Sequence, residues 1–202
     1  MILTKEEVDL MALEELATPD SKANLGGNLF KFRQRTLAEK SCAAGPGDLI
    51  EIGVLAGDTS ILLAEIARKY GRRLICIDNW PTTGVAAPYR LDLAEASFYR
   101  QMSPYEDVYE LWRVDANAPE TLDRIRKGKW AYALSDDGHQ YEDHFQQLCA
   151  LLPVSTGIVV ADDVYYHNTV KDAMIHAMLR NPDWKILHAD NLALREGFMV
   201  RG

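Results

Sequence analysis

Short apolar runs alternate with helical stretches along most of this chain, and this alternation restricts its possible folds more than any other feature. Runs rich in β-branched or apolar residues predict strands at 48–54, 73–79, 109–115, 130–136 and 157–163. Stretches with helical spacing come after them, at 59–70, 93–102, 120–128, 141–152 and 170–179. Strands that are apolar on both faces and alternate with helices are typical of a parallel sheet covered on both sides.

The two ends of the chain depart from this alternation. Near the N-terminus, Thr4 to Ala17 and Leu29 to Ala43 predict two consecutive helices. Near the C-terminus, residues 184–190 and 196–202 are strand-like and are separated by a short polar link, which predicts an antiparallel hairpin at the sheet edge. With the five central strands, this gives a doubly wound, mostly parallel, seven-stranded α/β sheet.

The length and composition fit one globular domain. A chain of 202 residues, with 48% hydrophobic and 26% charged residues, can bury a sizeable core. No repeat or linker divides it. We therefore predict a single domain over residues 1–202, with an N-terminal helical cap at 1–45 and the α/β core at 48–202.

Charge and cysteine content limit the partners and the compartment. The net charge is −8 and no run of lysine and arginine occurs, which argues against nucleic-acid binding. The apolar runs are too short to cross a bilayer and no secretory signal is evident, so we expect no membrane association. Cys42, Cys76 and Cys149 are scattered, which favours buried thiols in a reducing, cytoplasmic setting. The sequence is also compatible with a homo-oligomer.

Acidic residues follow four of the five central strands. Because the carboxyl ends of parallel strands meet at one edge, where ligands bind in open α/β sheets, we expect these acids to gather there. Aspartate is also a good N-cap of the helix that follows a strand, and this alternative holds for each acid taken singly. The acids concerned are Asp78, Asp115, Asp136 with Asp137, and Asp162 with Asp163.

The remaining central strand, at 48–54, ends in a glycine turn. Gly53 and Gly57 flank it, and Thr59 and Ser60 begin the next helix. The glycines can be plain turn residues that adopt positive φ. The spacing matches neither G-x-G-x-x-G nor the phosphate loop of nucleotide-binding proteins. What remains is a loop that lets a ligand approach the backbone, beside a helix start that favours a carboxylate or another anion.

The segment EIGVLAGDTS, residues 51–60, resembles the first motif of class I S-adenosylmethionine-dependent methyltransferases. This resemblance implies a Rossmann-like methyltransferase fold in which the loop passes under the methionine part of the cofactor. It also implies that Asp78 holds the ribose hydroxyls and that Asp115 and Ala116 border the adenine. The cofactor contacts so predicted are Glu51, Gly53, Gly57, Thr59, Ser60, Asp78, Asn79, Asp115, Ala116 and Asp136.

Two further segments, SDDGHQYEDHF at 135–145 and VVADDVYYHN at 159–168, resemble a subgroup that includes macrocin O-methyltransferase and, more distantly, catechol O-methyltransferase. In that subgroup, an acid after the fourth strand and a pair after the fifth bind Mg²⁺ beside the methyl donor. Counting back from the His-x-Tyr makes Asp136 the first ligand, whereas counting from the Asp-Gly makes it Asp137. We favour Asp136, with Asp162 and Asp163 as the other ligands.

The residue types suit this chemistry independently of the resemblance. Three carboxylates form a hard oxygen site for Mg²⁺, or for Mn²⁺ or Ca²⁺, and such an ion can favour the alkoxide of a substrate hydroxyl. Crowded acids repel one another without a cation, although Asp162 and Asp163 could also be solvated helix caps. His139 is the predicted general base, with Asp136 as the second catalytic residue; the alternative is that His139 only orients the next helix.

The function expected from these features is metal-assisted transfer of a methyl group to a hydroxyl of a small molecule, such as a sugar or a phenol. Two alternatives stay open at this point. One is an NAD-dependent oxidoreductase on a similar sheet, although the dinucleotide motif is missing. The other is a non-catalytic or repurposed protein that keeps the donor pocket.

Overall fold

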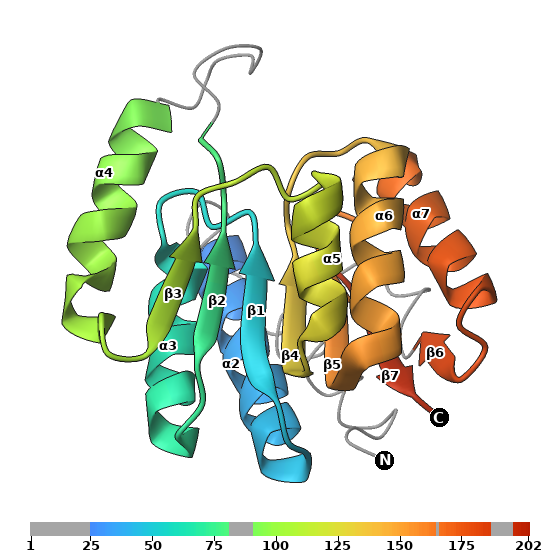
Figure 1. Ribbon diagram of the computed structural model, residues 1–202, viewed down its shortest axis with the longest axis horizontal. Helices are drawn as coiled ribbons and strands as arrows, with labels where there is room; N and C mark the ends of the chain where they lie inside the picture. The colour runs from blue at the N-terminus through green and yellow to red at the C-terminus, as the bar shows by residue number, and fades with distance from the viewer. Residues whose placement is uncertain (1–24, 81–90, 165, 187–195) are drawn as a thin grey trace.

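The computed structural model describes residues 25–80, 91–164, 166–186 and 196–202, and its centre is a seven-stranded sheet (Figure 1). The strand order is β3-β2-β1-β4-β5-β7-β6. The strands are β1 (Asp48–Ile52), β2 (Leu74–Ile77), β3 (Tyr109–Trp112), β4 (Trp130–Ser135), β5 (Ser155–Ala161), β6 (Trp184–Ile186) and β7 (Gly197–Arg201). The first five run parallel, whereas β7 pairs antiparallel with both β5 and β6.

The predicted doubly wound, mostly parallel sheet with an antiparallel C-terminal pair is therefore confirmed. Helix α2 (Leu25–Ala44) precedes β1. The other helices connect successive strands: α3 (Asp58–Tyr70), α4 (Leu91–Met102), α5 (Pro119–Lys127), α6 (Tyr141–Leu151) and α7 (Asn168–Leu179), with short 3-10 turns at Ser103–Tyr105 and Leu152–Val154. The helix predicted at Thr4 to Ala17 lies outside the described residues.

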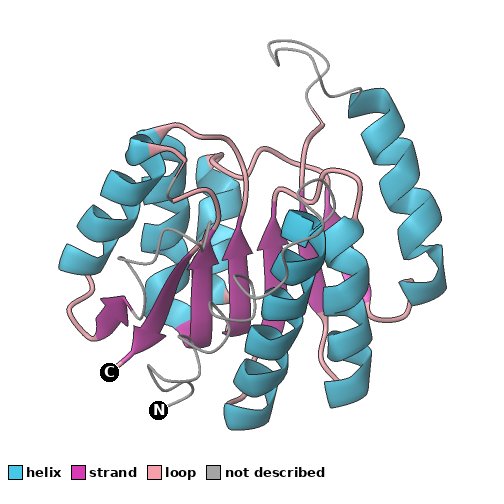
Figure 2. Ribbon diagram, turned by 180° about the vertical axis from the view of Figure 1, so that it is seen from behind, coloured by secondary structure: helices cyan, strands magenta, loops and turns pink. Residues whose placement is uncertain are grey.

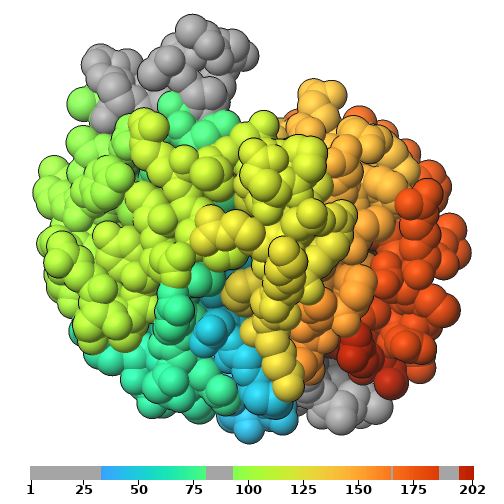
Figure 3. Space-filling view, viewed as in Figure 1, coloured from blue at the N-terminus to red at the C-terminus, as the bar shows by residue number. Residues whose placement is uncertain are grey.

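Helices cover both faces of the sheet. Helices α5, α6 and α7 lie on the face turned to the viewer in Figure 1, and Figure 2 shows α2 and α3 on the opposite face. In the space-filling view, yellow and orange side chains from the region of α5 to α7 lie over the centre and right of the first of these faces, and green ones lie over its left (Figure 3). The two layers explain why the central strands are apolar on both sides.

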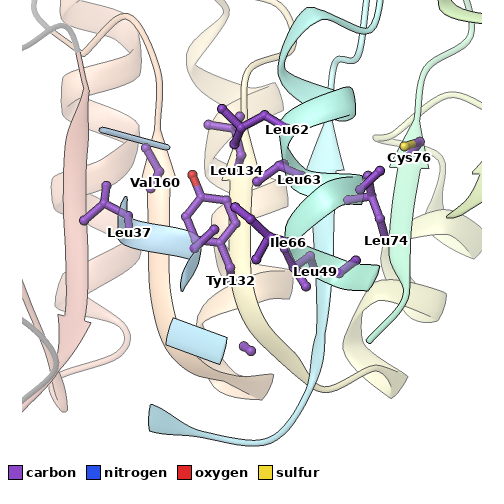
Figure 4. Packing of buried hydrophobic residues seen from close by; sticks show 14 of the residues in the cluster. Leu37, Leu49, Leu62, Leu63, Ile66, Leu74, Cys76, Tyr132, Leu134 and Val160 are labelled. Atoms are coloured by element: carbon purple, nitrogen blue, oxygen red, sulfur yellow. The ribbon is translucent and has the colours of Figure 1, made fainter. Parts of the chain in front are cut away.

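Alternate residues of each strand supply two separate cores. On the α2 and α3 side, Leu37, Leu63 and Ile66 pack against strand residues such as Leu49 and Tyr132 (Figure 4). On the other side, the core joins strand residues of the opposite parity to α5, α6 and α7. The period of two along each strand thus decides on which face of the sheet a side chain packs. The same alternation decides to which side the residues just after each strand point.

None of the helices in the described ranges is both long enough and apolar enough to span a bilayer.

Candidate functional site

The carboxyl ends of the central parallel strands stop level with one another. Ile52 of β1 pairs with Ile77 of β2 and with Ser135 of β4, and Ser135 pairs with the last residue of β5, Ala161. The next residues along the chain therefore form a row across the sheet edge. Reading from β2 to β5, that row is Asp78, Gly53, Asp136 and Asp162, which confirms the predicted gathering at one edge.

The glycine turn after β1 is fastened to Asp78. The Leu55 backbone N–H donates to Asp78 Oδ2 at 2.9 Å, and the Trp80 N–H donates to Oδ1 at 2.8 Å. Gly53, Leu55 and Gly57 all have positive φ, of 87°, 46° and 89°. This backbone brings the loop against the end of β2.

Two other predicted cofactor contacts lie beneath this loop and bind each other. Glu51 is buried, and the Ser60 hydroxyl donates to its Oε2 at 2.6 Å. Burial raises the pKa of Glu51 to about 8, although the Ser60 hydrogen bond opposes that rise. We interpret the pair as a support that joins β1 to the first turn of α3. Thr59 is half-buried in the same turn.

Replacing Glu51 with glutamine is expected to flatten the pH dependence of stability. In the folded protein Glu51 keeps its proton up to about pH 8, whereas its ordinary pKa is 4.5. The contribution of the protonated carboxyl to the free energy of unfolding is fully present below pH 4.5. It declines as the pH rises to about 8, by at most about 1.4 kcal/mol per pH unit. Urea unfolding at both ends of this window measures the difference, and parallel curves for the two proteins would contradict the assignment.

The predicted adenine end lies beyond β3. Asp115 is exposed and its Oδ1 accepts a hydrogen bond from the Asn117 N–H at 2.9 Å, while Ala116 is buried. Asn79, after β2, is also exposed. Asp137 belongs to this side of the site: burial, followed by the charges of Asp78, Asp143 and Asp115, raises its pKa to about 6, and a hydrogen bond with Gln147 opposes the rise.

Asp136 turns to the other side, where it meets the pair after β5. Carboxylate oxygens of Asp136, Asp162 and Asp163 lie within 4.8 Å of one another. Burial raises the pKa of Asp136 well above its ordinary value, and the charge of Asp162 and a hydrogen bond with it add to the rise. Between the two alternatives from sequence, the geometry favours Asp136 as the ligand in this cluster.

The donor set of this cluster fits a hard divalent cation. It offers three carboxylates from two neighbouring strand ends and no sulfur, which is the type of ligand that Mg²⁺ prefers. Like charges this close are unfavourable unless they are protonated or bridged by a cation. Asp163 also has a positive φ of 56°, a conformation that costs a non-glycine residue energy and is often retained at functional sites.

The histidines separate into two groups. His139 is 44% exposed, its Nε2 lies 3.4 Å from Asp163 Oδ2, and its ring centroid is 4.1 Å from that of His167. His144 is instead buried and bridges Ser135 Oγ, at 3.1 Å, and the Gly138 carbonyl oxygen, at 2.7 Å. His144 therefore fixes the loop that carries His139. His176 contacts Tyr141, and His188 lies outside the described residues.

A buried polar group beside the acid cluster escaped the sequence analysis. Glu196, just before β7, accepts hydrogen bonds from the Arg33 guanidinium at 3.0 Å and from Gln34 at 3.3 Å. Burial raises the pKa of Glu196, Arg33 opposes the rise, and the charge of Asp162 adds to it. These contacts anchor α2 beneath the site, and no local motif marks residues 163 positions apart as partners.

Comparisons with known proteins agree with this fold. The sequence model of the family described as "Methyltransferase domain" matches residues 50–164. Among solved structures, the O-methyltransferase NovP is similar with a TM-score of 0.63 at 20% identity, over 85% of this chain and 79% of NovP. The calicheamicin methyltransferase CalS11 has a TM-score of 0.61 at 17% identity, over 98% of this chain and 93% of that one.

A third structure was determined with the methyl donor bound. TomG from Streptomyces achromogenes, an O-methyltransferase involved in tomaymycin synthesis, was solved in complex with SAM. It has a TM-score of 0.57 at 18% identity, over 99% of this chain and 91% of TomG. The search of curated proteins found no match. The family match covers more than half of the chain, so this protein belongs to the methyltransferase-domain family, as the class I motif predicted.

Proposed function

We propose that this protein transfers a methyl group from S-adenosylmethionine to a hydroxyl of a small molecule, with the help of a divalent cation. The row of strand ends is the observation that carries the proposal. Gly53 and Asp78 stand on one side and the cluster of Asp136, Asp162 and Asp163 on the other, and the strands that carry them are neighbours paired in register. Donor and acceptor would thus meet above the end of β1 and β4.

Each group has a definite task in this proposal. The Asp78 carboxylate accepts hydrogen bonds from the ribose hydroxyls, and the glycine turn lets the donor approach the backbone. A bound divalent cation would act as a Lewis acid toward the acceptor hydroxyl. As the new oxygen–carbon bond forms, the carbon–sulfur bond breaks and sulfur keeps its electron pair. His139 takes the hydroxyl proton, because it is partly exposed at this edge of the sheet and the ordinary pKa of histidine is close to neutral pH.

The names of similar structures suggest the acceptor classes. One neighbour is described as a TDP-rhamnose 3'-O-methyltransferase and another as a putative caffeoyl-CoA O-methyltransferase. Sugar and phenolic hydroxyls are therefore the classes to test. We expect the protein to convert S-adenosylmethionine to S-adenosylhomocysteine with a member of such a panel, and EDTA to suppress the conversion. Turnover that is unaffected by EDTA would contradict the role of the cation, whereas donor binding without any turnover would favour a repurposed protein.

Replacing Asp78 with asparagine is expected to weaken S-adenosylhomocysteine binding by about 30-fold, or about 2 kcal/mol. The amide loses one acceptor oxygen and presents an NH₂ group where a backbone N–H now donates. Calorimetric titration measures the affinity. Asp48→Asn is the matched control, since Asp48 also accepts a backbone N–H, from Arg73 at 3.0 Å, but stands at the opposite end of β1. Equal losses in both variants would remove Asp78 from the donor site.

A further inference from the structure

We propose that His139, Asp163 and His167 form a second cation site, which takes a transition metal such as Zn²⁺ or Co²⁺. A ligand atom from each residue lies within 4.8 Å of the others. This set shares Asp163 with the carboxylate cluster but replaces the other two carboxylates with imidazoles. The two sites are therefore adjacent and differ in the metals that they prefer.

Backbone contacts hold the ligands of this second site in place. The N–H groups of Tyr166 and His167 both donate to the Asp163 carbonyl oxygen at 3.0 Å, so the chain turns back and brings His167 beside Asp163. The Thr169 hydroxyl donates to the His139 carbonyl oxygen at 2.6 Å, which joins the two loops. His144 fixes the same loop one residue earlier, through the Gly138 carbonyl oxygen. The backbone of the two loops that carry the ligands is thus held in place without a metal.

The ligand types decide which metals fit. Imidazole nitrogen suits Zn²⁺, Co²⁺ and Ni²⁺, whereas Mg²⁺ prefers an all-oxygen environment. Two histidines and one carboxylate leave a further coordination position, as in catalytic zinc sites with three protein ligands. His139 is 44% exposed and Asp163 14% exposed, so that position faces solvent and a metal can enter.

Occupation of this site has a consequence for the reaction, and this consequence rests on the proposed function. A metal bound to His139 takes up an imidazole lone pair that would otherwise accept the hydroxyl proton. It also draws on Asp163, a proposed ligand of the carboxylate cluster. Zn²⁺ is therefore expected to inhibit a reaction that Mg²⁺ supports.

Cobalt provides a direct test, because the visible absorption of Co²⁺ shifts and strengthens when protein nitrogen and oxygen ligands replace water, whereas Mg²⁺ does not absorb. The protein, free of any histidine tag, is titrated with Co²⁺ in excess Mg²⁺, and the absorption gives the affinity. We expect one Co²⁺ per chain, and an affinity at least about tenfold lower in His167→Ala. His176→Ala is the matched control, because His176 is an exposed histidine of α7 outside the cluster, and it should bind as the wild type does.

Four outcomes would overturn the proposal: no cobalt absorption beyond that of the free ion in the wild type, unchanged affinity in His167→Ala, an equal loss in His176→Ala, or a complete loss in Asp162→Ala. Asp162→Ala should keep cobalt binding, and its complete loss there would place the metal in the carboxylate cluster instead. Calorimetry with S-adenosylhomocysteine and with Mg²⁺ on the same proteins tests the proposed function separately. His167→Ala should keep both of those affinities, and thermal melting confirms that each variant is folded.

Discussion

Replacing Gly53 with alanine is expected to destabilise the fold by about 3 to 5 kcal/mol, from backbone strain and steric overlap together. Gly53 has a φ of 87°, which a residue with a side chain rarely adopts. An added Cβ would lie 2.6 Å from the carbonyl carbon of Asp136, and closer still to its oxygen. Those atoms belong to the backbone and cannot move aside as a side chain could. The Asp136 N–H donates to the Ile52 carbonyl oxygen at 2.8 Å, so relief of the overlap requires β1 and β4 to separate.

Urea unfolding of the two proteins measures this cost. Gly71→Ala is the matched control, because Gly71 also has a positive φ, of 63°, but an added Cβ there meets nothing within 4 Å. That variant bears the strain without the overlap and should lose only about 1 kcal/mol. Equal losses at the two positions would mean that the close approach of Gly53 to β4 is not a feature of the protein in solution.

Replacing Asp162 with alanine is expected to weaken Mg²⁺ binding by at least about 100-fold, more than the loss usual for an outer-shell partner of a metal ligand. Asp162 is 3% exposed and contributes one of the three carboxylates of the cluster. S-adenosylhomocysteine binding should stay within about twofold, since the groups proposed to hold the donor are elsewhere on the edge. The variant should melt no lower than the wild type in EDTA, because a buried like charge has been removed.

Calorimetric titration with Mg²⁺ measures this loss, and Asp137→Ala serves as the control. Asp137 follows Asp136 directly, yet the acids that raise its pKa are Asp78, Asp143 and Asp115. The control should therefore keep Mg²⁺ binding. If Asp137→Ala lost Mg²⁺ and Asp162→Ala kept it, the cation would lie on the donor side of β4, and the proposed arrangement would be wrong.

The sequence was sufficient to predict the sheet and the position of the site within it. The five parallel strands are short and mostly apolar on both faces, and a helix separates each from the next, which leaves few alternatives to a parallel, doubly wound sheet. Once the strands are parallel, the residues after them must meet at one edge. The gathering of Asp78, Asp136 and Asp162 follows from topology, without knowledge of any side-chain contact.

The direction of each acid could not be predicted with the same ease. Asp136 and Asp137 are neighbours, and counting along the motif allowed either as the metal ligand. The period of two along β4 distinguishes them. Tyr132 and Leu134 pack on the α2 and α3 side of the sheet, and Asp136 continues their alternation, which directs it toward the acids after β5. This alternation can be used only when the end of the strand is known to within one residue.

Long-range partners were beyond sequence reasoning for a different reason. Glu196 contacts Arg33 only because β7 pairs antiparallel with β5 and because α2 packs on the same part of the sheet. Neither residue belongs to a motif, and a buried ion pair of this kind depends on packing that local patterns do not specify. The role of His144 as a loop support was missed although its partners Ser135 and Gly138 lie only nine and six positions away, because that role rests on side-chain packing that no motif marks.

The adjacency of donor and cation can be measured directly by nuclear magnetic resonance of bound S-adenosylhomocysteine in the presence of Mn²⁺, a paramagnetic substitute for Mg²⁺. The protons beside the sulfur should relax much faster than those of the adenine, which is expected at the Asp115 end, and Asp162→Ala should remove the difference. Failure of S-adenosylhomocysteine to bind, or equal relaxation along its whole length, would contradict a site in which cation and methyl donor lie side by side.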